Sequence, residues 1–267
     1  MASVRQPAVA GTFYPRGERE LARVVGKHLD QARKDGRLAN SPTVPKALIV
    51  PHAGYVYSGP VAAAAYVRLE PARDTIERVV IIGPAHRVAL RGLALPEAEL
   101  FSTPLGQVPV DELAVASLRG LEQVTVSARA HEFEHSLEVH LPFLQTVLGR
   151  FSIVPLVAGH AGAEEVDEVI ERVWGGPETV ILISSDLSHY YDYDTARRMD
   201  AGATRAIERL DPSGLMEESA CGRVPVGGLL VAADRHGLEC TTLDVRNSGD
   251  TAGSRDEVVG YGSYAFG

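Results

Sequence analysis

Short apolar runs rich in valine and isoleucine recur along the chain. They read ALIV at 47–50, VVII at 79–82, FSIVPLVAG at 151–159, TVILISS at 179–185 and CTTLDV at 240–245, and the tail VVGYGSYAF at 258–266 resembles them. Continuous apolar runs suit strands that are covered on both faces. Each run is therefore predicted to be a buried strand.

Helical patterns separate these runs. In 17–32 the apolar residues Leu21, Val24, Val25 and Leu29 share one face, and helices are also predicted at 111–119, 136–149, 163–174, 195–209 and 224–236. The polar stretch 34–46 is predicted to be a loop. Strands that alternate with helices predict an α/β fold, here a three-layer α/β/α sandwich around a mainly parallel or mixed sheet. No shift in composition marks a boundary, so residues 1–267 are predicted to form one domain.

The charge balance and cysteine content narrow the functional classes. With 26 basic and 35 acidic residues the net charge is −9, which argues against general nucleic-acid binding. No apolar run approaches the roughly 18–20 residues of a membrane span, and the amino terminus lacks the apolar centre of a secretory signal. The two cysteines, Cys221 and Cys240, stand in unrelated contexts. We therefore expect a cytoplasmic protein without a disulfide scaffold, a membrane partner or a nucleic-acid partner.

Histidines and carboxylates follow several of the predicted strands. His52 follows ALIV, His86 follows VVII, Asp186 and His189 follow TVILISS, and Asp250 follows CTTLDV. Sites in open α/β sheets form beyond the carboxyl ends of the strands, so these side chains are expected to converge. Imidazole and carboxylate are the ligands of zinc and of non-haem iron(II). The pattern predicts a metal or catalytic centre.

A second cluster, HEFEHSLEVHLPFL, spans residues 131–144. Ser136 is expected to cap a helix, with His135 just before it and Glu138 and His140 in the first turns. One interpretation gives His135 an acid–base role, or has Glu138 orient a ligand histidine. The other is an ordinary helix start, with Glu138 favoured by the helix dipole. Cys221 could be a nucleophile, but a buried or helix-capping cysteine suits its context better.

Six motifs together carry a family resemblance. They are AGTFYP (10–15), PHAGYVYSG (51–59), GPAHR (83–87), EHSLEVHLPFL (134–144), SSDLSHY (184–190) and CGRVPVG (221–227). In this order they resemble the Memo family, also called AmmeMemoRadiSam system protein B. The resemblance implies a fold similar to class III extradiol dioxygenases, which use non-haem iron(II), with the site at the carboxyl edge of the sheet.

The resemblance also implies roles for particular residues. It makes His52 and His86 metal ligands and places Asp186 and His189 in the same pocket. In animal members a cysteine before an Arg-Asn pair supplies a further ligand, but here that position is Val245, which cannot ligate. We expect His189 as the third ligand, with Asp186 or Asp250 as alternatives.

The residues expected to do acid–base chemistry are His135, Asp186 and His189. In the related dioxygenases a glutamate fills the third ligand position, and none stands at or beside Val245. This difference weakens the case for ring cleavage.

Three functions compete. The leading one is a Memo-family protein whose cleft holds a divalent or redox metal, iron(II) ahead of zinc or copper, and which works with a radical-SAM enzyme and an associated Memo-system protein. The chain lacks the C-x-x-x-C-x-x-C motif, so radical chemistry would belong to that partner. The second is a free-standing extradiol dioxygenase, a metal-dependent oxidoreductase. The third is a non-catalytic module that binds a peptide or phosphotyrosine, although only Arg87 and Arg246 stand near the motifs to meet a phosphate.

Overall fold

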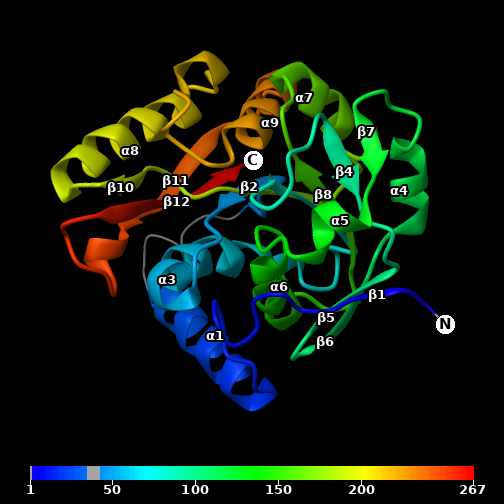
Figure 1. Cartoon of the computed structure of the whole chain (residues 1–267), viewed down its shortest axis with the longest axis horizontal. Helices are drawn as coiled ribbons and strands as arrows, with labels where there is room; N and C mark the ends of the chain where they lie inside the picture. The colour runs from blue at the N-terminus through cyan, green and yellow to red at the C-terminus, as the bar shows by residue number, and fades with distance from the viewer. Residues whose placement is uncertain (1, 35–42) are drawn as a thin grey trace.

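A large mixed sheet forms the framework of the computed structural model, which describes residues 2–34 and 43–267 (Figure 1). Within these residues the sheet has nine strands. Their order is β10 (His189–Tyr191), β12 (Val258–Phe266), β2 (Ala47–Val50), β9 (Thr179–Ser184), β3 (Arg78–Pro84), β8 (Ser152–Ala158), β4 (Leu93–Leu95) and β7 (Val124–Val126), and β11 (Cys240–Asn247) pairs with β12.

The centre of the sheet is parallel. Strands β2, β9, β3 and β8 run in one direction, whereas β12 is antiparallel to β2 and β4 is antiparallel to β8. Nearly every residue of the four central strands is buried, which explains their uninterrupted apolar sequences. All six predicted strands are present. The carboxyl ends of β2, β3 and β9 therefore meet at one edge.

Helices cover both faces of the sheet, as Figure 1 shows. One layer holds α1 (Glu18–Arg33), α3 (Tyr55–Tyr66) and α6 (Leu141–Val147), and the other holds α7 (Ala163–Arg172), α8 (Tyr193–Glu208) and α9 (Arg223–Arg235). Shorter helices are α4 (Glu112–Leu118) and α5 (Ala128–Glu132), with 3₁₀ turns η1 (Val67–Ala72), η2 (Glu138–His140), η3 (Pro212–Gly214) and η4 (Ser248–Asp250). The predicted three-layer α/β/α sandwich is confirmed. Among the described residues, none of the helices is long and apolar enough to cross a bilayer.

Two local predictions differ from the structure. Helix α3 was not predicted, because its apolar residues surround it and leave no amphipathic pattern. The helix expected at 136–149 begins only at Leu141, after the η2 turn. Ser136 does not cap it, because its hydroxyl donates to the carbonyl of Pro84 on β3. Most of the loop predicted at 34–46, residues 35–42, lies outside the described residues.

A buried carboxylate fastens the amino-terminal segment to the body of the protein. Glu138, which is fully buried, accepts hydrogen bonds from the Arg5 guanidinium, the backbone N–H groups of Ala8 and Val9, and the Tyr14 hydroxyl. The idea that Glu138 orients a ligand histidine is thus wrong. Its four donors instead hold the segment from Arg5 to Tyr14 against residues 131–140. This segment includes β1 (Val4–Arg5), which pairs with β5 (Leu100–Thr103) and, through it, β6 (Gly106–Pro109) in a small second sheet.

Replacing this carboxylate should loosen the amino-terminal segment. Glu138→Gln leaves the buried Arg5 guanidinium without its counter-charge, so we expect the free energy of unfolding to fall by about 3–5 kcal/mol. Ala8 and Val9 donate to different oxygens of Glu138, and the glutamine amide replaces one of these oxygens with an NH₂ donor, so hydrogen exchange should accelerate at one or both of these residues. The exposed neighbour Glu132→Gln is the matched control and should change neither quantity. Unchanged exchange at Ala8 and Val9 in Glu138→Gln would refute this anchoring role.

Two buried histidines should make the fold acid-sensitive. Burial lowers the pKa of His131 to about 4 and the pKa of His140 to about 3. As the pH falls below about 6.5, the unfolded chain takes up protons at these histidines before the folded one does. The free energy of unfolding should therefore decline from about pH 6.5 to about pH 4, by up to about 1.4 kcal/mol per pH unit for each histidine.

Denaturant unfolding at a series of pH values measures this decline. His131→Gln keeps an N–H donor toward the Ala94 carbonyl, which His131 Nε2 approaches at 2.9 Å. The slope of unfolding free energy against pH should become shallower in this variant. The exposed His160→Gln should keep the wild-type slope, and an equal slope in wild type and His131→Gln would contradict the prediction.

Candidate metal centre

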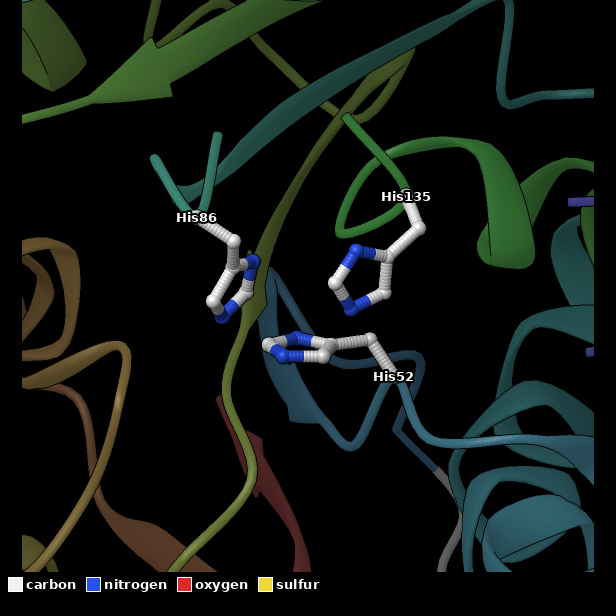
Figure 2. A group of neighbouring side chains, drawn as sticks. All are labelled: His52, His86 and His135. Carbon is white, nitrogen blue, oxygen red and sulfur yellow. The ribbon is translucent and has the colours of Figure 1, made fainter. Parts of the chain in front are cut away.

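Three histidines from distant parts of the chain converge at the carboxyl edge of the sheet (Figure 2). His52 follows β2, His86 follows β3, and His135 lies between α5 and η2. Each offers one ring nitrogen, and these nitrogens lie within 4.8 Å of one another. The ring centroids are 5.1 Å apart for His52 and His86, 5.4 Å for His52 and His135, and 4.5 Å for His86 and His135. Imidazole is a ligand that zinc, copper and iron ions accept.

The five predicted site residues line a single cavity of about 520 Å³. His52, His86, His135, Asp186 and His189 all face it. The group whose nitrogens converge, however, contains His135 and does not contain His189. The structure thus brings His135, expected only as an acid–base residue, to the two histidines at the strand ends. His189 lies in β10 on the wall of the same cavity.

Hydrogen bonds assign the ring nitrogen that His52 presents. The Ser184 hydroxyl donates its own hydrogen to the carbonyl of Ser136 at 2.6 Å, so toward His52 its oxygen can only accept a hydrogen bond. His52 Nδ1 lies 2.6 Å from that oxygen and is therefore the N–H of the ring. Nε2 is left with its lone pair, which is the form a metal ligand requires.

One buried carboxylate orients the other two histidines. Glu134 accepts from His86 Nδ1 at 2.9 Å and from the backbone N–H groups of His86, His135 and Ser136 at 2.6–2.9 Å. Burial alone raises the pKa of Glu134, but the hydrogen bonds from His86 and Ser136 outweigh it and hold the pKa at about 2. Glu134 is thus an anion that fixes His86 with its Nε2 free. A carboxylate behind a ligand histidine is the usual outer support of a metal site.

Close packing places His135 beside the strand ends. Gly83 lies near the end of β3, and a Cβ added there would meet the Ser136 Oγ at 2.8 Å and a Leu137 methyl at 2.9 Å. The bare glycine therefore lets the 135–137 segment lie against the strand. His135 also packs against the ring of Phe13, with centroids 4.8 Å apart.

The surroundings of His52 and His135 favour the neutral form of these two rings. Burial, and then the neighbouring histidines, lower the pKa of His52 well below its usual range. Burial and His86 likewise lower the pKa of His135 to about 4. Neutral imidazole is the ligand form, so these two rings are ready to bind an ion at neutral pH.

The donor set fits a transition-metal ion. Nitrogens about 2.1 Å from one ion can be at most about 4.2 Å apart, so a 4.8 Å separation closes with small ring rotations. The Nδ1 of His135 is buried and lacks a hydrogen-bond partner, although Glu134 Oε1 lies 3.3 Å away. Hydrogen bonding therefore leaves a nitrogen for an ion on His86 and His135. On His52 the hydrogen-bonding neighbour of Nε2 is the thiol of Cys221, which is only a weak partner.

An aspartate and a cysteine flank His52. Asp186 Oδ1 accepts the backbone N–H of His52 at 2.8 Å, and Oδ2 lies 4.0 Å from His52 Nε2. Burial raises the pKa of Asp186 to about 7. The Cys221 sulfur lies 3.4 Å from the same Nε2, and burial together with Asp186 raises the pKa of the thiol. Cys221 is therefore a neutral thiol beside the nitrogen that His52 presents.

Other candidates lie away from the three histidines. Val245 is 37% exposed on β11 and is not among the described residues that line the cavity. Asp250 accepts from the Tyr193 hydroxyl and from the backbone N–H of Asn247, which holds it in the loop after β11. The sequence interpretation missed Glu134 and Ser184, although both stand inside quoted motifs. For Glu134 the sequence did offer a signal, because it is an acidic residue directly before His135.

Aromatic side chains form part of the cavity wall. Phe13, Tyr57, Tyr190 and Tyr261 line it, and Tyr190 is 72% exposed. The backbone of Tyr190 has a φ of 62°, a left-handed conformation that a tyrosine rarely adopts. It lies at an irregularity in the pairing of β10 with β12. The bulge thus holds an exposed aromatic ring on the wall of the cavity.

The chain is similar in sequence to proteins of one family over nearly its whole length. The family model described as Memo-like protein matches residues 5–265. A MEMO1 family protein of Ignicoccus hospitalis is 38% identical over 98% of both chains, and one of Aquifex aeolicus is 35% identical over 97% of both. The crystal structure of the uncharacterized protein JW3007 from Escherichia coli K12 has a TM-score of 0.57 and 15% identity, covering 84% of this chain and 100% of that one. That similarity concerns the fold alone.

The supporting role of Glu134 leads to a test of metal affinity. Glu134→Gln removes the charge behind His86 and turns an amide N–H₂ toward groups that are themselves donors. We expect affinity for zinc or cobalt(II) to fall about 10–100-fold, the usual effect of removing an outer-sphere partner. Competition with a coloured chelator measures it, and Glu132→Gln is the matched control. Equal affinity in both variants would show that Glu134 has no such role.

Proposed function

This chain belongs to the Memo-like family, and we propose that its histidine-lined cavity is a metal centre of the dioxygenase-like type, with iron(II) as its ion. The observation that carries the proposal is the convergence of His52, His86 and His135, two of them with Nε2 freed by hydrogen bonds to Ser184 and Glu134. Zinc and copper accept the same donors. Iron(II) is preferred from the resemblance to class III extradiol dioxygenases.

The metal ion and the residues around it would have different tasks in a reaction. A bound iron(II) ion would supply Lewis-acid and one-electron redox chemistry. Asp186 and His189 line the same cavity and are placed to hold or move a proton of a bound substrate. Phe13, Tyr57 and Tyr190 can cover the ligand and reduce its contact with water.

A partner would have to supply radical chemistry. The chain has two cysteines, too few for a three-cysteine iron–sulfur motif. We therefore propose that the protein works in the cytoplasm with a radical-SAM enzyme and the associated Memo-system protein, acting on a small molecule or peptide. Both cysteines are free thiols, which suits a reducing compartment.

Metal titration of single variants tests the centre. Metal-free protein is titrated anaerobically with iron(II), zinc and copper(I), comparing wild type with His86→Ala, His135→Ala and His189→Ala. We expect removal of His86 or His135 to weaken binding by more than about 100-fold, since each is a direct ligand, and removal of His189 to weaken it by less than about tenfold. The exposed His160→Ala is the control.

The outcomes separate the candidate functions. A large loss in His189→Ala with none in His135→Ala would restore His189 as the third ligand. Wild-type affinity in all variants would remove the metal centre and leave a non-catalytic binding module. Turnover of a catechol panel by the iron-loaded protein would identify a free-standing extradiol dioxygenase, which we do not expect.

A further inference from the structure

A second cavity adjoins the histidine-lined one. Its volume is about 760 Å³, and it lies between α1, α3 and the turn at residues 11–16. Phe13 lines both cavities. The loop after β11 also touches both, since Ser248 and Gly253 line the first and Thr251 and Ala252 the second. The two cavities are therefore neighbours, divided by Phe13 and this loop.

The walls of the second cavity carry an excess of positive charge. Arg16, Arg23 and Lys27 line it, against one acidic residue, Glu20. All four are exposed. Among the described residues, no ion pair involves the three basic side chains. A local positive surface stands out in a chain whose net charge is −9.

Two of the basic side chains, Arg23 and Lys27, lie on the same face of α1. Glu20, Arg23 and Lys27 are three and four residues apart, so they share a face of α1. Arg23 and Lys27 are like charges at i and i+4, an arrangement that costs an isolated helix a few tenths of a kcal/mol. A bound anion would relieve that repulsion.

Gly11 leaves room for the third basic side chain, Arg16, close to Phe13, which lies between the two cavities. Gly11 has a φ of 93°, and a Cβ added there would lie 3.3 Å from Arg16 Nε. Arg16 therefore folds over the turn that carries Phe13, and its Nε makes a long hydrogen bond of 3.4 Å to the carbonyl of Ala10. The rest of the guanidinium is free to bind an anion as a two-pronged donor.

We propose that this cavity, bounded by Arg16, Arg23 and Lys27, is a subsite for the anionic group of a small-molecule substrate. The proposal rests on the proposed function, because the other end of the same molecule would reach the histidine-lined cavity past Phe13. A volume of about 760 Å³ lies in the range of small-molecule sites. Phosphate and carboxylate share the chemistry that these side chains recognise.

Anion titration of metal-free protein tests the subsite. The probes are inorganic pyrophosphate and tricarballylate, one for each source of negative charge, measured by calorimetry at low ionic strength. The subsite variant is Arg16→Gln/Arg23→Gln/Lys27→Gln. The matched control, Arg19→Gln/Arg150→Gln/Arg209→Gln, removes the same charge from exposed positions that do not line this cavity.

We expect the subsite variant to bind the preferred probe about tenfold or more weakly, because it loses charge-assisted hydrogen bonds, and the control to change by less than about twofold. Amide resonances of Gly11, Thr12 and Thr251 should shift on titration of the wild type. The probe with the higher affinity identifies phosphate or carboxylate as the recognised group.

Several results would overturn the subsite. They are equal losses in the two triple variants, the absence of wild-type binding at millimolar concentrations, or resonance shifts confined to other regions. The His135→Ala variant separates this proposal from the metal centre. If it keeps anion binding while metal binding proves absent from the wild type, the subsite stands and the metal centre fails.

Discussion

The candidate metal centre depends on the hydrogen bonds of the Glu134 carboxylate. His86 reaches it from the end of β3, whereas His135 and Ser136 follow it directly in the chain. A single buried anion thus holds two histidines of the candidate centre that are separated in the chain by the whole of β4 to α5. Its four donors also satisfy the charge, which a buried carboxylate requires. Without it, His86 would have no partner to set its tautomer.

Three buried carboxylates show how surroundings assign different roles to one functional group. Four donors keep Glu134 ionised, with a pKa of about 2. Asp186 has weaker compensation for its burial, so its pKa rises to about 7 and it can exchange a proton near neutral pH. Glu138 faces Arg5 and the amino-terminal segment and serves the architecture. All three are buried, so the donors that surround each carboxylate distinguish these cases.

The sequence predicts much of this arrangement because of parallel-sheet geometry. Uninterrupted apolar runs identify β2, β3 and β9, and side chains that follow parallel strands must meet at one edge, which brings His52, His86 and Asp186 together. His135 is different, since it lies in an irregular segment whose position depends on contacts with Gly83 and Phe13. Such contacts leave no periodic signal. Helix α3 was not predicted because apolar residues lie all around it, including the exposed Val56 and Tyr57, and leave no amphipathic pattern.

The anchoring of the amino-terminal segment determines when, during synthesis of the chain, the site can form. Arg5 and Glu138 are 133 positions apart, so Arg5 leaves the ribosome long before its partner exists. During synthesis the segment that carries Phe13 must wait, because contacts between such distant positions form late. Phe13 lines both cavities, and the loop after β11 also lines both, so neither can be complete until nearly the whole chain has been made. A nascent chain that captured a metal ion before then would hold it in an unfinished, water-filled pocket.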